Sequence, residues 1–333
     1  MIKNTSKMLF LIMLVMSTMI VISSNNWMSM WMGMEMNLMS FIPMMSKYKN
    51  NFSSEACMMY FLVQTLGSIM LLMSILLCPM VMMSPIMISD MVITTMMISI
   101  LIKMGMSPFH MWVPEIMEKM SWMNCLLLMT WQKTAPMIVM SNFLSFNSMI
   151  LMPIVLSTMM GAIGGLNQTS MRKIMAYSSI SHSGWMVACM NYEHKMWMSY
   201  FIIYSMMTTM ITVLFNDNSI FYLNQMQMHN STMFNKINYT IMMMSMGGMP
   251  PFMGFLPKWM VIQTMISSNL YFPIMLMMMF SLVTLFYYMR MMTTMIMINT
   301  DTNKWMLNES KKKNMIMLMM NLSLPMATIF SFF

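Results

Sequence analysis

Apolar runs of about 20 residues, separated by short polar breaks, recur along the whole chain. A helix of that length spans the hydrocarbon core of a bilayer, so each run predicts a transmembrane helix. Only 8% of the 333 residues are charged, against about 25% in a soluble globular domain. So few charges cannot cover a soluble surface. The sequence therefore predicts an all-α, polytopic membrane helix bundle and excludes a soluble two-domain protein.

The runs predict about eleven transmembrane helices in one transmembrane domain over residues 1–333. Their expected spans are 8–23, 27–45, 57–78, 86–112, 122–146, 149–166, 173–191, 196–216, 237–266, 270–292 and 314–333. The fourth and ninth are long and contain Gly and Pro. Lys3 and Lys7 before the first run resemble the start of a signal peptide. Because no small-residue cleavage site follows, we expect this run to be the first retained helix.

The basic residues predict an orientation. We place the N-terminus inside and let successive loops alternate between the two sides of the membrane. Of the 17 Lys and Arg residues, 13 then lie on the inner side, one (Lys195) lies on the outer side and three fall within helices. This asymmetry follows the positive-inside rule. The net charge of +8 is therefore explained by topology. A nucleic-acid surface is the competing explanation of a basic chain, but these charges are scattered over many loops, so no nucleic-acid partner is predicted.

Methionine is unusually frequent, with 72 residues. A packed core does not need so many flexible thioether side chains. Here Met occupies positions where Ile or Leu is usual, which indicates translation in an animal mitochondrion, where the AUA codon is read as Met. A metal-binding Met-rich domain would instead place clustered Met in polar segments.

Four charged residues lie within the apolar runs: Glu35, Lys103, Lys133 and Lys258. Each costs about 2.5–3.5 kcal/mol at a helix centre, or on the order of 10 kcal/mol together. They must therefore face a hydrated interior or one another, which favours a proton or ion pathway. The competing interpretation is an ion pair that only holds helices together, or a lysine that snorkels to the interface, which suits Lys258 best.

Two of these lysines lie beside predicted helix breaks. Proline removes an amide donor and clashes with the carbonyl one turn earlier. The freed carbonyls cannot face lipid, so they must line protein or a watery cavity. A broken helix with a nearby lysine is typical of a place where an ion crosses. The residues expected to break the helices are Gly105 and Pro108 in the fourth, and Gly247, Gly248, Pro250 and Pro251 in the ninth.

The breaks also recur at corresponding places. When the first ten helices are divided into two sets of five, residues 1–147 and 148–292, each break falls in the fourth helix of its set. Residues 293–333 then form a loop and a last helix. Because five is odd, the second set enters the membrane in the opposite direction. This inverted repeat with interrupted helices indicates the ion path of a transporter.

Two histidines are further titratable candidates, His110 and His182. Histidine changes charge near neutral pH, which suits a proton relay. The competing interpretation, strongest for His110, is a neutral ring bonded to a helix carbonyl. Haem ligation would need paired histidines on facing helices, which this spacing does not indicate.

Cofactor motifs are absent from the sequence. There is no G-x-G-x-x-G, Walker A or metal motif. The four cysteines, Cys57, Cys78, Cys125 and Cys189, are far apart, so no zinc, iron–sulfur or disulfide framework is predicted. Gly161, Gly164 and Gly165 resemble a small-residue packing face.

Five stretches carry a resemblance to a known family. They are WMGMEMNLMSFIP (31–43), LIKMGMSPFHMW (101–112), TWQKTAP (130–136), GAIGGLNQTSMRKIMAYSSISHSGWM (161–186) and GGMPPFMGFLPKW (247–259). In these the chain resembles the antiporter-like membrane-arm subunits of respiratory complex I, in their mitochondrially encoded, insect-like form. The last two helices match in hydropathy alone.

The resemblance implies a proton-translocating subunit of NADH:ubiquinone reductase in the mitochondrial inner membrane. It implies no cofactor in this chain, because NADH, FMN, iron–sulfur clusters and ubiquinone bind other subunits of the complex. The implied partners are other membrane-arm subunits, including neighbouring antiporter-like chains, and membrane lipids. In that membrane the asymmetry of the basic residues predicts the N-terminus in the matrix and the C-terminus in the intermembrane space. The family's ancestral form has additional N-terminal helices that animal versions lack, and we expect this chain to lack them too.

By resemblance, Glu35 is similar to the family's second-helix glutamate, and Lys103 and Lys258 to the lysines beside the first and second breaks. Lys133 is similar to the lysine of the central axis. We expect Glu35 to keep Lys103 charged until its influence weakens, and protons then to pass through Lys133 and His182 to Lys258. Two other interpretations stay open: a free-standing cation/proton antiporter, and a structural subunit whose buried charges only fix helix packing.

Overall fold

The computed structural model describes residues 5–46, 50–79, 85–143, 148–192, 196–225 and 233–297. These residues form helices and the segments that connect them, and they contain no strand; an isolated bridge pairs Ser170 with Tyr222. The all-α prediction is therefore confirmed for this part of the chain. The chain divides into two compact units, Met1–Asn147 and Ser148–Phe333. The last predicted helix, 314–333, lies outside the described residues.

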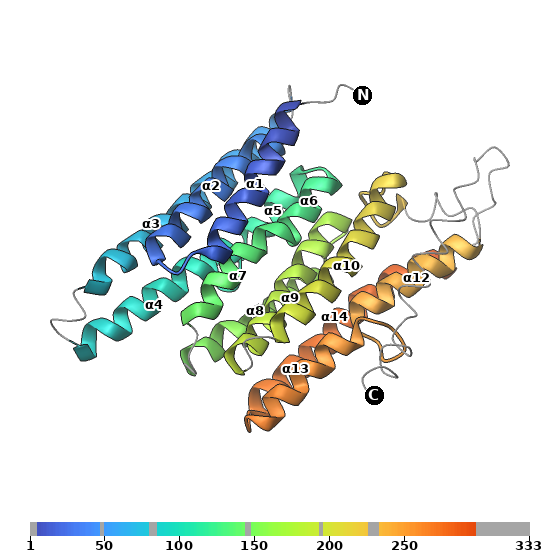
Figure 1. Cartoon of the computed structure of the whole chain (residues 1–333). Helices are drawn as coiled ribbons and strands as arrows, with labels where there is room; N and C mark the ends of the chain where they lie inside the picture. The colour runs from blue at the N-terminus through green and yellow to red at the C-terminus, as the bar shows by residue number, and fades with distance from the viewer. Residues whose placement is uncertain are drawn as a thin grey trace. The chain divides into compact units, whose positions relative to one another are not determined.

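The first unit packs its helices around α3 and α7. α1 and α2 lie side by side, α3 contacts α2, α4 and α5, and α7 contacts α1, α2, α4 and α6 (Figure 1). α3 thus contacts both α2 and α4. The helices are α1 (Thr5–Ser23), α2 (Trp27–Met45), α3 (Asn51–Leu77), α4 (Pro85–Met104), α5 (Trp112–Lys119), α6 (Trp122–Met129) and α7 (Trp131–Phe143).

The second unit is built on α8 and α9, which pack along one another, with α14 on α8 and both α10 and α13 on α9 (Figure 1). α12 contacts α10 and α14. Two of the predicted small residues let α8 and α9 approach, because a Cβ on Gly161 or Gly164 would lie within 2.8 Å of α9. The elements are η2 (Ser148–Ile150), α8 (Leu151–Leu166), α9 (Met171–Tyr192), α10 (Met196–Asp217), α12 (Met233–Gly247), α13 (Phe255–Ser267) and α14 (Tyr271–Met297).

The fourth predicted helix is interrupted at Gly105. α4 ends at Met104 and the chain becomes helical again at Trp112. Gly105 has a φ of +67°, a conformation that glycine adopts without the steric penalty of a Cβ. Its N–H donates to the Ile102 carbonyl, and the N–H of Met106 donates to the Leu101 carbonyl. These two bonds form a Schellman motif, which terminates the helix.

The ninth predicted helix is interrupted in the same way. α12 ends at Gly247, and α13 begins at Phe255. Gly248 has a φ of +77° and its N–H donates to the Ser245 carbonyl, while Met249 donates to the Met244 carbonyl. The prolines at 250 and 251 follow directly, where a helix cannot continue. Both breaks are thus the same backbone motif with glycine at the left-handed position.

Some predicted spans were wrong in detail. The span 122–146 is two helices, α6 and α7, which meet at Thr130. The short helix α5 lies where a loop was expected, because four of its apolar side chains pack into the unit. α3 begins at Asn51, six residues earlier than predicted, since the Asn50 side chain accepts a bond from the Phe52 N–H. Side-chain capping of this kind is not visible to a hydropathy profile.

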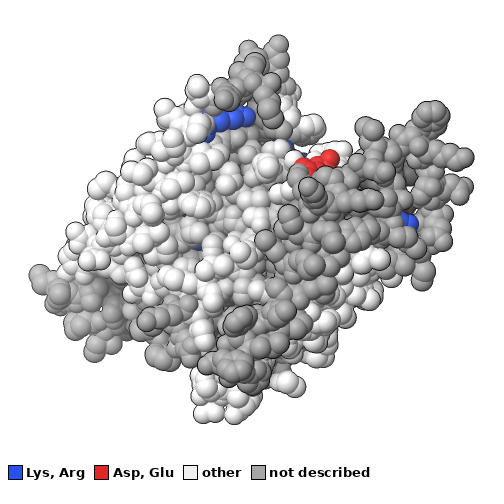
Figure 2. Space-filling view, turned by 45° about the vertical axis from the view of Figure 1, so that its right-hand side comes forward, with Lys and Arg blue, Asp and Glu red and all other residues white. Residues whose placement is uncertain are grey.

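Four described helices are long and apolar enough, by length and composition, to cross a membrane: α1, α3, α10 and residues 271–294 of α14. The larger number of spans remains a prediction. Their outward faces carry large exposed apolar side chains, including Met8, Leu62, Ile202 and Phe272. On the face in Figure 2 almost all described atoms belong to uncharged residues. This surface is typical of a protein whose solvent is lipid.

Candidate functional site

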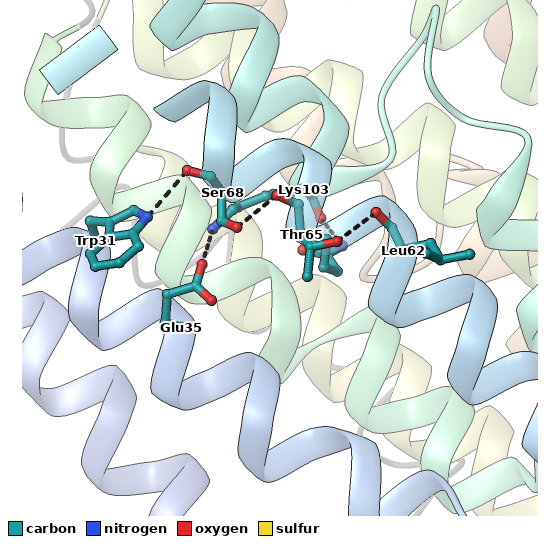
Figure 3. Close-up of polar contacts among 7 residues, drawn as sticks. Trp31, Glu35, Leu62, Thr65, Ser68 and Lys103 are labelled. Carbon is teal, nitrogen blue, oxygen red and sulfur yellow. Dashed lines mark hydrogen bonds and ion pairs between the residues drawn. The ribbon is translucent and has the colours of Figure 1, made fainter. Parts of the chain in front are cut away.

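Glu35 and Lys103 form an ion pair inside the first unit. The Lys103 Nζ lies 3.8 Å from the Glu35 Oε1, and the two side chains are 3% and 23% exposed. Glu35 projects from α2 and Lys103 from the last turn of α4, toward one another past α3 (Figure 3). The ammonium thus lies at the carbonyl end of a half-helix, where the helix dipole is negative. A carboxylate and a helix end together stabilise its charge.

α3 contacts both helices of this pair. The Trp31 Nε1 of α2 donates to the Ser68 carbonyl at 3.2 Å (Figure 3). The Gln64 Nε2 donates to the Lys103 carbonyl at 3.1 Å. Gly67 lies between these two contacts, and a Cβ there would stand 3.0 Å from the Lys103 Cγ. A single turn of α3 therefore positions α2 and α4 beside one another.

Lys133 is buried in the first turn of α7, directly after the interruption at Thr130. It was expected in the middle of a continuous helix. α7 packs on α4, the helix of Lys103, and on α2, the helix of Glu35. The helix of Lys133 thus packs on both helices of the ion pair.

A part-buried hydrogen-bonded chain lies on the same helices and was not predicted. The Tyr60 hydroxyl of α3 donates to the Gln132 Oε1 at 3.0 Å, and the Gln132 Nε2 donates to the Asn37 Oδ1 at 3.1 Å. The three residues come from α3, α7 and α2. Their neutral side chains gave no charge signal in the sequence. A search for polar residues within apolar runs would have found Asn37 and Gln132, the sequence neighbours of Glu35 and Lys133.

Lys258 is bound to the second break. It lies in the first turn of α13, is 7% exposed, and its Nζ donates to the Gly247 carbonyl at 2.8 Å. That carbonyl belongs to the last residue of α12, so it has no partner within the helix. Gly248 makes room for the side chain, since a Cβ there would lie 2.9 Å from the Lys258 Nζ. The ammonium therefore stays inside the unit and does not snorkel.

His182 is buried on α9 among aromatic side chains of α10. Its Nδ1 lies 2.8 Å from the Tyr200 hydroxyl, and its ring centroid lies 5.0 Å from that of Tyr204. An imidazole bonded to a phenol has a partner that can accept or donate a proton. α9 also packs on α13, the helix of Lys258.

His110 occupies the non-helical stretch between α4 and α5. Its Nδ1 lies 3.3 Å from the Pro108 carbonyl, and the side chain is buried. The Ser107–Pro108 peptide bond is cis. His110 therefore contacts the non-helical backbone of the first break rather than a helix carbonyl, and its role stays a prediction.

Arg290 lies within α14, which continues to Met297 beyond the predicted end at residue 292. Its guanidinium donates to the Leu166 and Gln168 carbonyls at the end of α8. Arg290 thus satisfies orphan carbonyls at a helix C-terminus.

Within the residues that the structure describes, no group of three or more His, Cys, Asp or Glu side chains is arranged to hold a metal ion. The site consists of single charged residues on separate helices. Such groups can bind and release protons and can stabilise charge along a path.

The sequence and the fold both have known relatives. The profile of the NADH:quinone oxidoreductase/Mrp antiporter transmembrane family matches residues 24–286. The NADH-ubiquinone oxidoreductase chain 2 of Locusta migratoria is 43% identical over 95% of this chain and 92% of its own. That of Anopheles gambiae is 41% identical over 96% of this chain and 95% of its own.

The chain belongs to the NADH-ubiquinone oxidoreductase chain 2 family. The resemblance seen in the sequence is thereby confirmed. Members from vertebrates are also similar, and the chain 2 protein of Bos taurus is 38% identical over 96% of this chain and 95% of its own.

Solved structures show the family's fold in more distant proteins. A chain of respiratory complex I from Thermus thermophilus superposes with a TM-score of 0.84 over 95% of this chain and 76% of its own, at 17% identity. A chain of the Mrp complex from Dietzia has a TM-score of 0.76 over 88% of this chain and 62% of its own, at 15% identity. The chain 2 fold is thus shared with Mrp complexes.

Proposed function

We propose that this chain is the proton-translocating core membrane subunit of a mitochondrial NADH:ubiquinone reductase. Protons pass through Glu35, Lys103, Lys133, His182 and Lys258. The observation that carries the proposal is the Glu35–Lys103 pair at the interrupted end of α4, in which Lys103 is buried and Glu35 half-buried. A charge pair inside the apolar bundle, beside open helix carbonyls, is costly, and a purely structural helix contact does not need it.

The first step depends on the balance of two effects on Lys103. Burial favours a neutral amine, whereas a carboxylate 3.8 Å away favours the charged ammonium. A separation of 3.8 Å is longer than a hydrogen bond, so a small movement of α2 or α4 changes the attraction. When the influence of Glu35 weakens, Lys103 releases its proton toward Lys133. The signal comes from neighbouring subunits.

The second unit continues the path. His182 and its Tyr200 partner receive the proton, and Lys258 passes it on. The Lys258 ammonium interacts with the Gly247 carbonyl at the break. Loss of its charge weakens this charge-assisted bond and so loosens the end of α12. His110, beside the first break, is a further candidate for this path.

The two units are proposed to be repeats of one five-helix arrangement. Five contacting helix pairs of the first unit have counterparts in the second. In the first unit they are α1–α2, α2–α3, α3–α5, α4–α7 and α1–α7. In the second unit they are, in the same order, α8–α9, α9–α10, α10–α13, α12–α14 and α8–α14. The same Schellman motif interrupts the fourth helix of each. The boundary between the compact units, Asn147–Ser148, supports the proposed division. Because five spans are an odd number, the repeats are expected to enter the membrane in opposite directions.

As a member of the family, the chain works within a larger complex in the mitochondrial inner membrane. NADH, FMN, iron–sulfur clusters and ubiquinone are proposed to bind other subunits, so this chain has no redox step of its own. Its partners are other membrane-arm subunits, including antiporter-like chains, and lipids that cover the apolar faces. No nucleic-acid partner is proposed.

The test uses the assembled complex with Glu35→Gln. We expect fewer protons translocated per NADH oxidised, with most of the complex still assembled, because the amide keeps the size of the side chain and removes only its charge. Glu55→Gln is the matched control. Glu55 also pairs with a lysine, Lys119 at 2.7 Å, but it is 59% exposed. Removing this exposed pair should change little.

Two outcomes contradict the proposal. If the number of protons translocated per NADH oxidised (the proton ratio) is unchanged in Glu35→Gln, the pair is only a structural contact. Cation/proton exchange by the isolated, reconstituted chain would instead support a free-standing antiporter.

A further inference from the structure

Gln64 is a buried residue of α3 that no charge or motif indicated. It is 6% exposed, and its amide reaches the Lys103 carbonyl of the neighbouring helix, 39 residues away in the sequence. This carbonyl is at the end of α4, beyond those that the Schellman motif satisfies. Gln64 therefore supplies a donor that the interrupted helix lacks.

The second break shows what happens when a lysine supplies the donor. There the open carbonyl of Gly247 is bound by the ammonium of Lys258 itself. In the first break a neutral amide binds the carbonyl, and the Lys103 ammonium faces Glu35. Among the described residues, the two lysines thus have different partners: at the first break a separate side chain donates to the open carbonyl, and at the second the lysine itself does.

We propose that Gln64 is a positioning residue for the Glu35–Lys103 pair. By binding the Lys103 carbonyl it fixes the last turn of α4 and leaves the ammonium to the carboxylate. Without this donor the ammonium competes for the open carbonyls at the end of α4, much as Lys258 binds the open carbonyl at the end of α12 in the other break. This inference rests on the proposed function of the pair.

The neighbouring contacts on α3 support this role. Gly67 lies one turn from Gln64 on the same face, and a Cβ there would stand 3.2 Å from the Ser99 carbonyl. α3 and α4 therefore approach closely where the Lys103 stem passes. Ser68 holds α2 through Trp31, which lies one turn before Glu35. The turn that carries Gln64 contacts both partners of the pair.

The test compares Gln64→Met with Thr65→Val in the assembled complex. Met keeps the length and approximate volume of Gln but cannot donate. Thr65 is the next residue on α3, and its hydroxyl donates only to the Leu62 carbonyl of its own helix (Figure 3). We expect Gln64→Met to lower the number of protons per NADH by the same factor as Glu35→Gln, and Thr65→Val to leave it unchanged.

A double variant separates positioning from general packing. If Gln64 acts through the pair, Gln64→Met combined with Glu35→Gln lowers the ratio no further than Glu35→Gln alone. A cryo-EM map of Gln64→Met should also show the Lys103 Nζ displaced from its 3.8 Å distance to Glu35. Additive losses, or an unchanged distance, would overturn the inference.

The remaining outcomes are equally decisive. A normal ratio in Gln64→Met, with a reduced one in Glu35→Gln, overturns the role of Gln64 and leaves the proposed function intact. A normal ratio in Glu35→Gln overturns both. If Gln64→Met does not assemble, Gln64→Glu replaces it: a protonated carboxyl donates to the carbonyl, and a carboxylate cannot. The proton ratio should then fall as the pH rises through the titration of the introduced group, and a profile equal to that of the wild type overturns the inference.

Discussion

The two lysines beside the breaks show how differently one residue type is used in one chain. Lys103 has a carboxylate partner and lies on the helix before its break. Lys258 has a carbonyl partner and lies on the helix after its break. A carboxylate can change the charge state of its partner strongly, whereas a carbonyl stabilises it modestly. We therefore assign control of proton release to Lys103 rather than to Lys258.

A first prediction concerns the two members of the pair. Lys103→Met leaves the Glu35 carboxylate without its partner, and Glu35→Gln leaves the ammonium, which can relieve the cost by giving up its proton. Both single variants should reduce the proton ratio. Combining them should reduce the amount of assembled complex by less than the two single losses together, since no orphan charge remains. Blue-native gels quantify assembly, and strictly additive losses would show that the residues do not interact.

At the scale of elements, the breaks explain how non-helical backbone is tolerated inside a membrane protein. Each Schellman motif satisfies two carbonyls by backbone N–H groups, and a side chain binds one more, from Gln64 in one case and Lys258 in the other. Lipid offers no hydrogen bonds, so these internal partners are required. Glycine at the left-handed position makes the motif possible.

The adjacent glycines of the second break provide a matched pair of variants. Gly248→Ala places a Cβ at a φ of +77° and 2.9 Å from the Lys258 Nζ. We expect it to cost about 1–3 kcal/mol and to displace the ammonium. Gly247→Ala adds a Cβ to a helical residue, with its nearest neighbour, the Leu285 Cγ, at 3.7 Å, so it should be neutral or slightly stabilising.

Thermal inactivation of the detergent-solubilised complex compares the two variants. Gly248→Ala should lower the temperature at which half of the activity is lost, and Gly247→Ala should not. Equal effects of both would mean that backbone conformation at Gly248 is not what the break requires.

At the scale of the whole chain, the surface and the charges have separate causes. The outward helix faces are apolar because lipid is their solvent. Two of the charges within the bundle have partners of opposite polarity, Glu35 for Lys103 and the Gly247 carbonyl for Lys258. Most of the other basic residues lie in predicted loops or near predicted helix ends, and we expect them to set the orientation.

The orientation gives a last prediction. We expect the N-terminus in the matrix and the C-terminus in the intermembrane space, from the excess of 13 basic residues on one side over one on the other. Lys311–Lys313, which lie outside the described residues, should be on the matrix side. Protease protection of an epitope there in mitoplasts, whose outer membrane is removed, supports this orientation. Cleavage before the inner membrane is opened would contradict it.

The sequence by itself determined the helical class, the approximate positions of most of the described helices and the positions of the two breaks. These are local properties. A chain in lipid must satisfy its backbone within each segment, so hydropathy identifies helices, and Gly and Pro identify where they stop. α2 agrees with its predicted span at both ends, and Gly105 and Gly248 take the positions where their helices end.

Only the tertiary structure decided which side chains meet. Three sets of contacts show this: the Glu35–Lys103 pair, the Gln64 bond to the Lys103 carbonyl and the Tyr60–Gln132–Asn37 chain. Each joins residues on different helices, 39 to 95 positions apart in the sequence. Such contacts depend on how each helix is rotated and how closely it packs, which a single sequence does not encode locally. The interruption at Thr130 has the same origin, because neither Gly nor Pro stands at that position to signal it.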